Sequence, residues 1–137
     1  MPVHVLIIED DPALLEAVRE HLVGRGHRVD TARTGREGLA AVARQHPQVV
    51  LLDLTLPDLD GAEVLREILR LDRRLSVIIV SGSLDMRRAR QLRRDGAFEY
   101  IVKPFELAHL DRMIAAAVGR ARLGTNRPPP AATPDAD

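Results

Sequence analysis

Short apolar segments alternate with longer amphipathic ones along most of the chain, and this alternation restricts the possible folds more than any other feature. The apolar segments are rich in Val, Ile and Leu, and we expect strands at residues 3–8, 28–32, 49–52, 76–80 and 99–102. Nearly continuous apolar strands are typical of parallel sheets that helices cover on both faces. The pattern therefore predicts an α/β fold of five βα units around a buried parallel sheet.

Helix-start signals lie in the amphipathic segments that follow these strands. Asp11 before Pro12 predicts an N-cap with proline at the first helical position. Thr34 and Asp60 are each followed three residues later by glutamate, which is the pattern of a capping box. Two further helices are expected at about residues 84–94 and 106–122. Their predicted core positions are Met86, Ala89 and Leu92 in the former, and Leu107, Leu110, Ile114, Ala117 and Val118 in the latter.

The length and composition suit one domain, which we expect over residues 1–123. Residues 124–137 include four prolines among small and polar residues, so this segment is predicted to be a disordered tail or linker. The 20 basic and 20 acidic residues cancel, which leaves no overall field to attract nucleic acid or a membrane. The chain has no cysteine for disulfide or thiolate chemistry, and no apolar run approaches the roughly 20 residues of a membrane span. We expect a cytoplasmic protein.

Polar residues stand at the carboxyl ends of four of the five expected strands. Glu9 and Asp10 follow the first strand and Asp53 follows the third. Ser81 follows the fourth strand and Lys103 the fifth. Because ligands bind outside the carboxyl ends of strands in an open parallel sheet, these five side chains are expected to meet in one crevice.

The chemistry of this set is coherent. Three carboxylates close together repel one another unless a cation joins them, and ligands that are all oxygen suit Mg²⁺ or Mn²⁺. One carboxylate can then attack phosphorus and form an aspartyl phosphate, while the metal, an ammonium group and a hydroxyl neutralise and position the phosphoryl group. Lys103 is the only lysine among the 20 basic residues, which indicates a site that needs a compact point charge.

Four motifs carry a resemblance to a known family. They are Ile8-Glu9-Asp10-Asp11, the segment Leu52-Asp53-Leu54-Thr55-Leu56-Pro57-Asp58-Leu59-Asp60-Gly61, Val80-Ser81-Gly82, and Tyr100-Ile101-Val102-Lys103-Pro104-Phe105. Over about residues 3–122 the chain resembles the receiver domains of bacterial response regulators, of which the chemotaxis regulator is the best-known single-domain member. The resemblance implies a flavodoxin-like doubly wound (βα)5 fold with strand order 2-1-3-4-5.

The resemblance also implies a role for each site residue. Asp53 would accept a phosphoryl group from the phosphohistidine of a sensor histidine kinase or phosphotransfer protein. Mg²⁺, the only cofactor implied, would be held by Asp10, Asp53 and the backbone carbonyl of Thr55, with Glu9 acting through water. Lys103 would bind a phosphoryl oxygen, and its peptide bond to the following proline would be cis.

Signalling through the fold is implied in the same way. Ser81 would reach for the phosphoryl group and draw Tyr100 inward, which would change the face made by the fourth helix, fifth strand and fifth helix. A downstream protein or output domain would bind that face, and the resemblance allows a dimer that forms on phosphorylation. The chain would be a signalling phosphoacceptor, not an enzyme, and would catalyse only its own phosphorylation and slow autodephosphorylation. Thr55 and Ser83 occupy positions that tune dephosphorylation in the family.

Other readings of the same residues are open. The main alternative is a receiver-like interaction module that signals without phosphorylation. A haloacid-dehalogenase-like phosphatase would need an aspartate where Thr55 stands, and a flavodoxin would need a phosphate-binding loop where residues 9–12 are acidic. Asp11, Asp58 and Asp60 are better explained as caps and turn residues than as metal ligands.

One basic cluster stands out, formed by Arg87, Arg88, Arg90, Arg93 and Arg94. A solvated helix face explains it, and so does contact with an acidic partner. Direct binding of nucleic acid is not expected, because the chain has no helix-turn-helix and no aromatic residues among these arginines.

Overall fold

A five-stranded parallel sheet forms the centre of the protein in the computed structural model, which describes residues 2–122. The strand order is β2-β1-β3-β4-β5, as predicted. The strands are β1 (His4–Ile8), β2 (Arg28–Ala32), β3 (Val49–Asp53), β4 (Ser76–Ser81) and β5 (Glu99–Val102). The helices are α1 (Pro12–Gly24), α2 (Gly35–Gln45), α3 (Gly61–Leu71), α4 (Met86–Arg94) and α5 (Leu107–Arg122). The predicted α/β fold is therefore confirmed.

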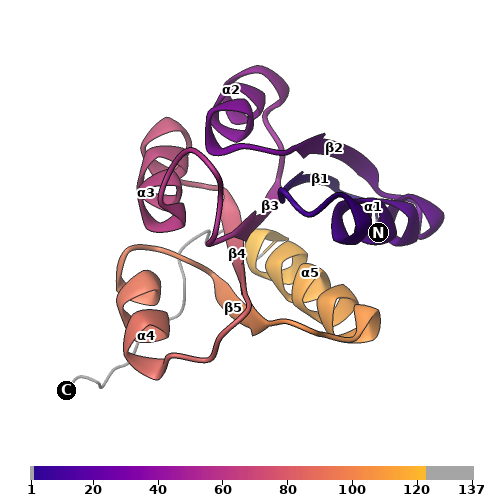
Figure 1. Ribbon diagram of the computed structural model, residues 1–137. Helices are drawn as coiled ribbons and strands as arrows, with labels where there is room; N and C mark the ends of the chain where they lie inside the picture. The colour runs from indigo at the N-terminus through magenta and orange to yellow at the C-terminus, as the bar shows by residue number, and fades with distance from the viewer. Residues whose placement is uncertain (1, 123–137) are drawn as a thin grey trace.

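Helices cover both faces of this sheet, with α1 and α5 on one side and α2, α3 and α4 on the other (Figure 1). Alternate strand residues enter opposite cores: Leu6 and Leu52 pack with α2 and α3, whereas Val5 and Leu51 pack with α1 and α5. Both sets are buried. This two-sided burial explains why the strands read as continuous apolar runs and not as alternating ones.

Two strands extend one residue further than the sequence pattern predicts. β3 includes Asp53, which pairs with Val80, and β4 includes Ser81, which pairs with Val102. The backbone N–H of Lys103 also donates to the Ser81 carbonyl at 2.7 Å. The polar residues at these strand ends are thus held by the sheet ladder itself.

The predicted caps are present. The Asp11 side chain accepts hydrogen bonds from the N–H groups of Ala13 and Leu14 at the start of α1. Thr34 caps α2 by accepting from the Glu37 N–H, and Asp60 caps α3. These caps fix where three helices begin, close to the carboxyl edge of the sheet.

The prediction for α4 was wrong in one respect: Met86 is 57% exposed, not inward. Asp85 is the N-cap, so the helix begins at Met86 and not at residue 84. On this nine-residue helix only Leu92 is buried. With about 100° per residue, Met86 lies roughly 120° around the axis from Leu92 and therefore outside the narrow contact stripe.

The predicted tail, residues 124–137, lies outside the described residues. Within residues 2–122, we find no helix that combines the length and the apolar character needed to cross a membrane.

Candidate functional site

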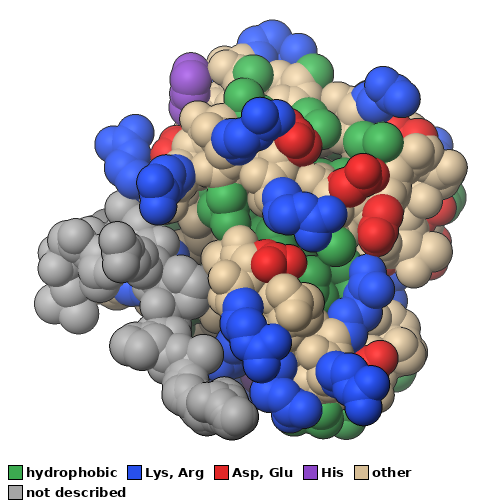
Figure 2. Space-filling view, turned by 90° about the vertical axis from the view of Figure 1, so that its left-hand side faces the viewer, with side chains coloured by type: hydrophobic (Ala, Val, Ile, Leu, Met, Phe, Trp, Pro, Cys, Tyr) green, Lys and Arg blue, Asp and Glu red, His purple; other side chains and the backbone are tan. Residues whose placement is uncertain are grey.

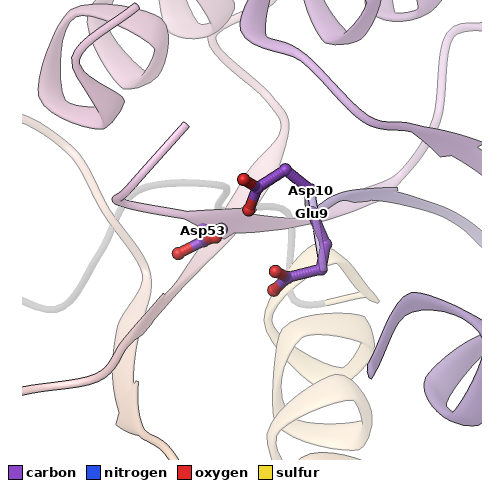
Figure 3. A group of neighbouring side chains, drawn as sticks. All are labelled: Glu9, Asp10 and Asp53. Atoms are coloured by element: carbon purple, nitrogen blue, oxygen red, sulfur yellow. The ribbon is translucent and has the colours of Figure 1, made fainter. Parts of the chain in front are cut away.

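Three carboxylates converge at the carboxyl edge of the sheet (Figure 3). Glu9 and Asp10 follow β1 and Asp53 ends β3, and each offers an oxygen within 4.8 Å of the others. Glu9 and Asp53 are only 4% and 3% exposed, whereas Asp10 is more accessible. The sequence prediction that these three residues meet is confirmed by their geometry.

Asp53 has an unusual protonation equilibrium. Burial raises its pKa from 3.8 to about 6, and the neighbouring Glu9 carboxylate acts in the same direction. The Thr55 N–H, which donates to Asp53 Oδ1 at 3.1 Å, and the Lys103 ammonium both oppose this rise. An added cation among these carboxylates would favour the charged, nucleophilic form of Asp53.

Apolar side chains next to Glu9 and Asp53 explain why these carboxylates lose hydration. A small cavity of about 10 Å³ lies beneath the two buried carboxylates, with room for about one water molecule. Its apolar lining comes from β1, β3 and β4, from α1, and from Phe105 after β5; these residues are Ile7, Ile8, Leu14, Val18, Leu51, Val80 and Phe105. The carboxylates therefore have protein beneath them and water on one side only.

Lys103 provides the positive charge that is already present at the site. Its Nζ lies 3.2 Å from Glu9 Oε1 and 3.6 Å from Asp53 Oδ1. The peptide bond between Lys103 and Pro104 is cis, as the resemblance implied. One ammonium between two buried carboxylates leaves the site negative, because Asp10 adds a third carboxylate.

The described residues fit a hard divalent cation. The donors are carboxylate oxygens, with no histidine or cysteine among them, and this is the ligand type that Mg²⁺ prefers. Glu9 has other partners as well: its Oε2 accepts from the Asp11 N–H at 3.1 Å, and its carboxylate faces Lys103. Such a residue suits a contact to the ion through water, while Asp10 and Asp53 have the freer oxygens.

Ser81 and Tyr100 share a hydrogen-bond acceptor. The Ser81 hydroxyl donates to the Ser83 carbonyl at 3.2 Å, and the Tyr100 hydroxyl donates to the same carbonyl at 2.9 Å. The Ser83 N–H donates back to Ser81 Oγ at 3.3 Å. A rotation of the Ser81 side chain would therefore change the backbone position on which the tyrosine depends. Sequence reasoning missed this contact, because a backbone carbonyl leaves no signal in residue type.

The loops around the site are joined by Asp58. Its carboxylate accepts from the N–H groups of Gly35 and Arg36, at 2.8 and 3.0 Å, so it caps α2 from the β3–α3 loop. The sequence indicated a turn and capping role for Asp58 but not its partner, because the partner lies 23 residues away. Arg33, which the sequence did not single out, reaches the Asp10 carbonyl at 3.5 Å.

Comparison with known proteins gives a consistent result. The model of the response regulator receiver domain family matches residues 5–115. The chain is 41% identical over 116 residues to the transcriptional regulatory protein KdpE of Mycobacterium tuberculosis and 38% identical over 116 residues to AfsQ1 of Streptomyces coelicolor. Each alignment covers 85% of this chain and 51% of the relative, so the chain spans about half the length of these curated relatives.

Solved structures agree in fold. A CheY-like response regulator receiver domain protein from Methanospirillum hungatei superposes with a TM-score of 0.86 at 28% identity, covering 91% of this chain and 100% of the other. The CheX-CheY-BeF3-Mg complex from Borrelia burgdorferi gives a TM-score of 0.81 at 25% identity, covering 85% and 89%.

Proposed function

The chain belongs to the response regulator receiver domain family, and on that premise we propose that it is the phosphoacceptor of a two-component or phosphorelay system. Asp53 takes the phosphoryl group from the phosphohistidine of a histidine kinase or phosphotransfer protein in an Mg²⁺-dependent step. The observation that carries this proposal is the convergence of Glu9, Asp10 and Asp53 within 4.8 Å, with Lys103 beside them.

In the proposed reaction an Asp53 carboxylate oxygen attacks phosphorus. The phosphorus–nitrogen bond to the donor histidine breaks, and the imidazole nitrogen keeps the electron pair and takes up a proton. Lys103 moves from its position between Glu9 and Asp53 to a phosphoryl oxygen and compensates its charge. The buried setting of Asp53 strengthens these electrostatic interactions, because little water competes for them.

Bound Mg²⁺ would neutralise charge on the carboxylates and on the phosphoryl oxygens. We assign its ligands to Asp10, Asp53 and the backbone carbonyl of Thr55, with Glu9 acting through water. The Thr55 assignment is supported by the hydrogen bond from its N–H to Asp53, which keeps this backbone segment beside the carboxylates. The solved CheY complex containing beryllofluoride and magnesium, a protein with the same fold, supports the choice of ion.

We further propose that Ser81 and Tyr100 transmit the phosphorylated state. When the Ser81 hydroxyl turns towards the phosphoryl group, it gives up its hydrogen bond to the Ser83 carbonyl. The Ser83 backbone, which also donates its N–H to Ser81 Oγ, is then free to shift, so the Tyr100 hydroxyl loses a fixed acceptor and the ring moves inward. The result is a shift in the face made by α4, β5 and α5, which a downstream protein or output domain reads. The chain spans only about half of its curated relatives, so their output is not carried over to it. That a downstream protein or output domain reads this face is therefore proposed here for the chain itself.

Labelling with acetyl phosphate and Mg²⁺ tests the acceptor. One hydroxylamine-sensitive phosphoryl group per molecule should appear by intact mass spectrometry, and Asp53→Asn should abolish it. Asp58→Asn is a matched control, since it removes an aspartate from the same loop region that serves as a cap. Normal labelling of Asp53→Asn, or no labelling of the wild type by acetyl phosphate or by a phosphorylated histidine donor, would refute the proposal and favour an interaction module that signals without phosphorylation.

A further inference from the structure

Helix α4 carries five arginines in nine residues: Arg87, Arg88, Arg90, Arg93 and Arg94. Its single buried residue, Leu92, faces the core. The arginines divide into two groups according to their partners, and the two groups have different consequences.

Two arginines hold the helix in place. Arg88 Nη2 lies 3.2 Å from Asp60 Oδ1 at the start of α3, and Arg93 pairs with Glu99 on β5. These ion pairs flank the helix on the sides that face its neighbours, so their charges are compensated within the fold.

The other three arginines, Arg87, Arg90 and Arg94, have spacing i, i+3, i+7, which places them on one exposed face of the helix. Within residues 2–122 none of them forms an ion pair; Arg94 only donates to the Gln91 side chain at 3.3 Å. Of the two carboxylates at the ends of the helix, Asp85 caps it by accepting from backbone N–H groups, and Asp95 pairs with Arg66 at 3.5 Å. We name these three residues the α4 arginine stripe. It carries three uncompensated positive charges, and like charges at this spacing destabilise a helix.

Apolar side chains adjoin the stripe. Leu84, just before α4, and Met86, its first residue, are 66% and 57% exposed. Figure 2 views the molecule from the side of α3 and α4 and shows Lys and Arg side chains gathered in its lower part, with few acidic ones among them. This surface therefore combines the α4 arginine stripe with two exposed apolar side chains, Leu84 and Met86.

We propose that the α4 arginine stripe is a docking surface for an acidic protein segment, with carboxylates over the three guanidinium groups and apolar side chains on Leu84 and Met86. This inference rests on the proposed function, because α4 belongs to the face through which phosphorylation is read, and it adds the chemistry of the partner. Guanidinium groups bind carboxylates with paired hydrogen bonds, so three in a row select a segment with several Asp or Glu side chains.

Two other occupants fit the observations less well. A nucleic acid would gain nothing from Leu84 and Met86, and the chain has a net charge of zero to attract it. A second copy of the chain docked with its two-fold axis through the α4 arginine stripe would bring two such stripes together, and like charges across that interface repel.

The test uses a fluorescent peptide of about 14 residues, long enough for three to four helical turns, with glutamates on one face and two leucines beside them. Binding to the full chain is measured by anisotropy at about 50 and 300 mM NaCl. The variant Arg87→Gln, Arg90→Gln, Arg94→Gln should bind at least about tenfold more weakly than wild type, with a smaller salt dependence. A matched control, Arg28→Gln, Arg44→Gln, Arg73→Gln, removes the same charge from other exposed positions and should bind within about twofold of wild type.

A second variant separates charge from folding. Lysine at the three stripe positions keeps the charge but not the paired hydrogen bonds, so its binding should lie between that of wild type and that of the glutamine variant. A cooperative melting transition verifies that each variant is folded. Equal peptide binding by wild type and the glutamine variant would overturn the proposal. So would tighter binding of a DNA duplex than of the peptide, or a dimer that only the stripe variants lose. Acetyl phosphate labelling of Asp53 is followed on the same proteins and should be unchanged, so failure of the acceptor site is distinguished from failure of the docking surface.

Discussion

Replacing Asp53 with Asn is expected to stabilise the metal-free protein. The Asp53 pKa rises from 3.8 to about 6 on folding, so the folded state disfavours the charged carboxylate by about 3 kcal/mol above pH 6. The side chain is only 4% exposed, so solvent screens little of this effect. This shift already includes the attraction of Lys103, which keeps Glu9 as a partner at 3.2 Å in the variant. Because the asparagine NH2 donates where a carboxylate oxygen accepts, part of this gain is lost, and we expect a net gain of about 2 kcal/mol in the free energy of unfolding at pH 7.5.

The sign of the pH dependence provides an independent check. A raised carboxyl pKa means that wild-type stability falls as pH rises from about 4 to about 6, and the loss is complete above that range. The two proteins should therefore have similar stability near pH 4 and diverge towards pH 7.5. Millimolar Mg²⁺ should narrow the gap at pH 7.5, because it binds the folded wild type and relieves the repulsion among carboxylates.

Urea denaturation followed by circular dichroism measures this difference. With slopes of about 1–3 kcal/mol per molar urea, a gain of about 2 kcal/mol moves the midpoint by roughly 1 M. Asp58→Asn should change stability in the opposite direction. Burial alone would raise the Asp58 pKa, but N–H groups of Arg36 and Gly35 hold it below its usual value, so its charge stabilises the fold at neutral pH. A metal-free Asp53→Asn variant no more stable than wild type at pH 7.5, or equally more stable at pH 4, would refute the reasoning.

Four further outcomes are expected. Ser81→Ala should still accept phosphate but should lose the change in hydrogen exchange that beryllofluoride causes at α4 in wild type; an intact change would exclude the serine as the switch. Lys103→Gln should slow labelling by acetyl phosphate at least about tenfold while Mg²⁺ still raises the melting temperature, which separates phosphoryl contact from metal binding. Gly61→Ala should destabilise the protein by about 1–3 kcal/mol in urea titrations, because a Cβ there would lie 2.6 Å from the Leu54 Cα, a backbone atom that cannot turn aside. Deletion of residues 124–137 should leave melting temperature and labelling rate unchanged, as their composition predicts.

The sequence pattern was sufficient for features that depend on local chemistry. Continuous apolar runs predicted the buried strands, and Asp11, Thr34 and Asp60 predicted where three helices begin, because these signals act over a few residues. Strand-end polarity predicted that Asp53 and Lys103 would meet, because parallel strands bring their carboxyl ends to one edge. Other features depend on distant partners. The exposure of Met86 follows from where Leu92 contacts the core, and the Asp58 cap follows from how two loops approach each other. Neither can be deduced from neighbours in the chain.

The candidate site is assembled from segments that are far apart in the chain, so it is complete only when the whole sheet has formed. Lys103 and Glu9 are 94 positions apart and meet only after β5 has joined β4 and β1 has joined β3. A chain still on the ribosome could already have Glu9 and Asp53 in place while Lys103 has not yet reached them. Pairing of such distant segments is the slow part of building a parallel sheet. A copy in which β5 has not yet paired therefore lacks this ammonium group and should accept the phosphoryl group more slowly than a completely folded one.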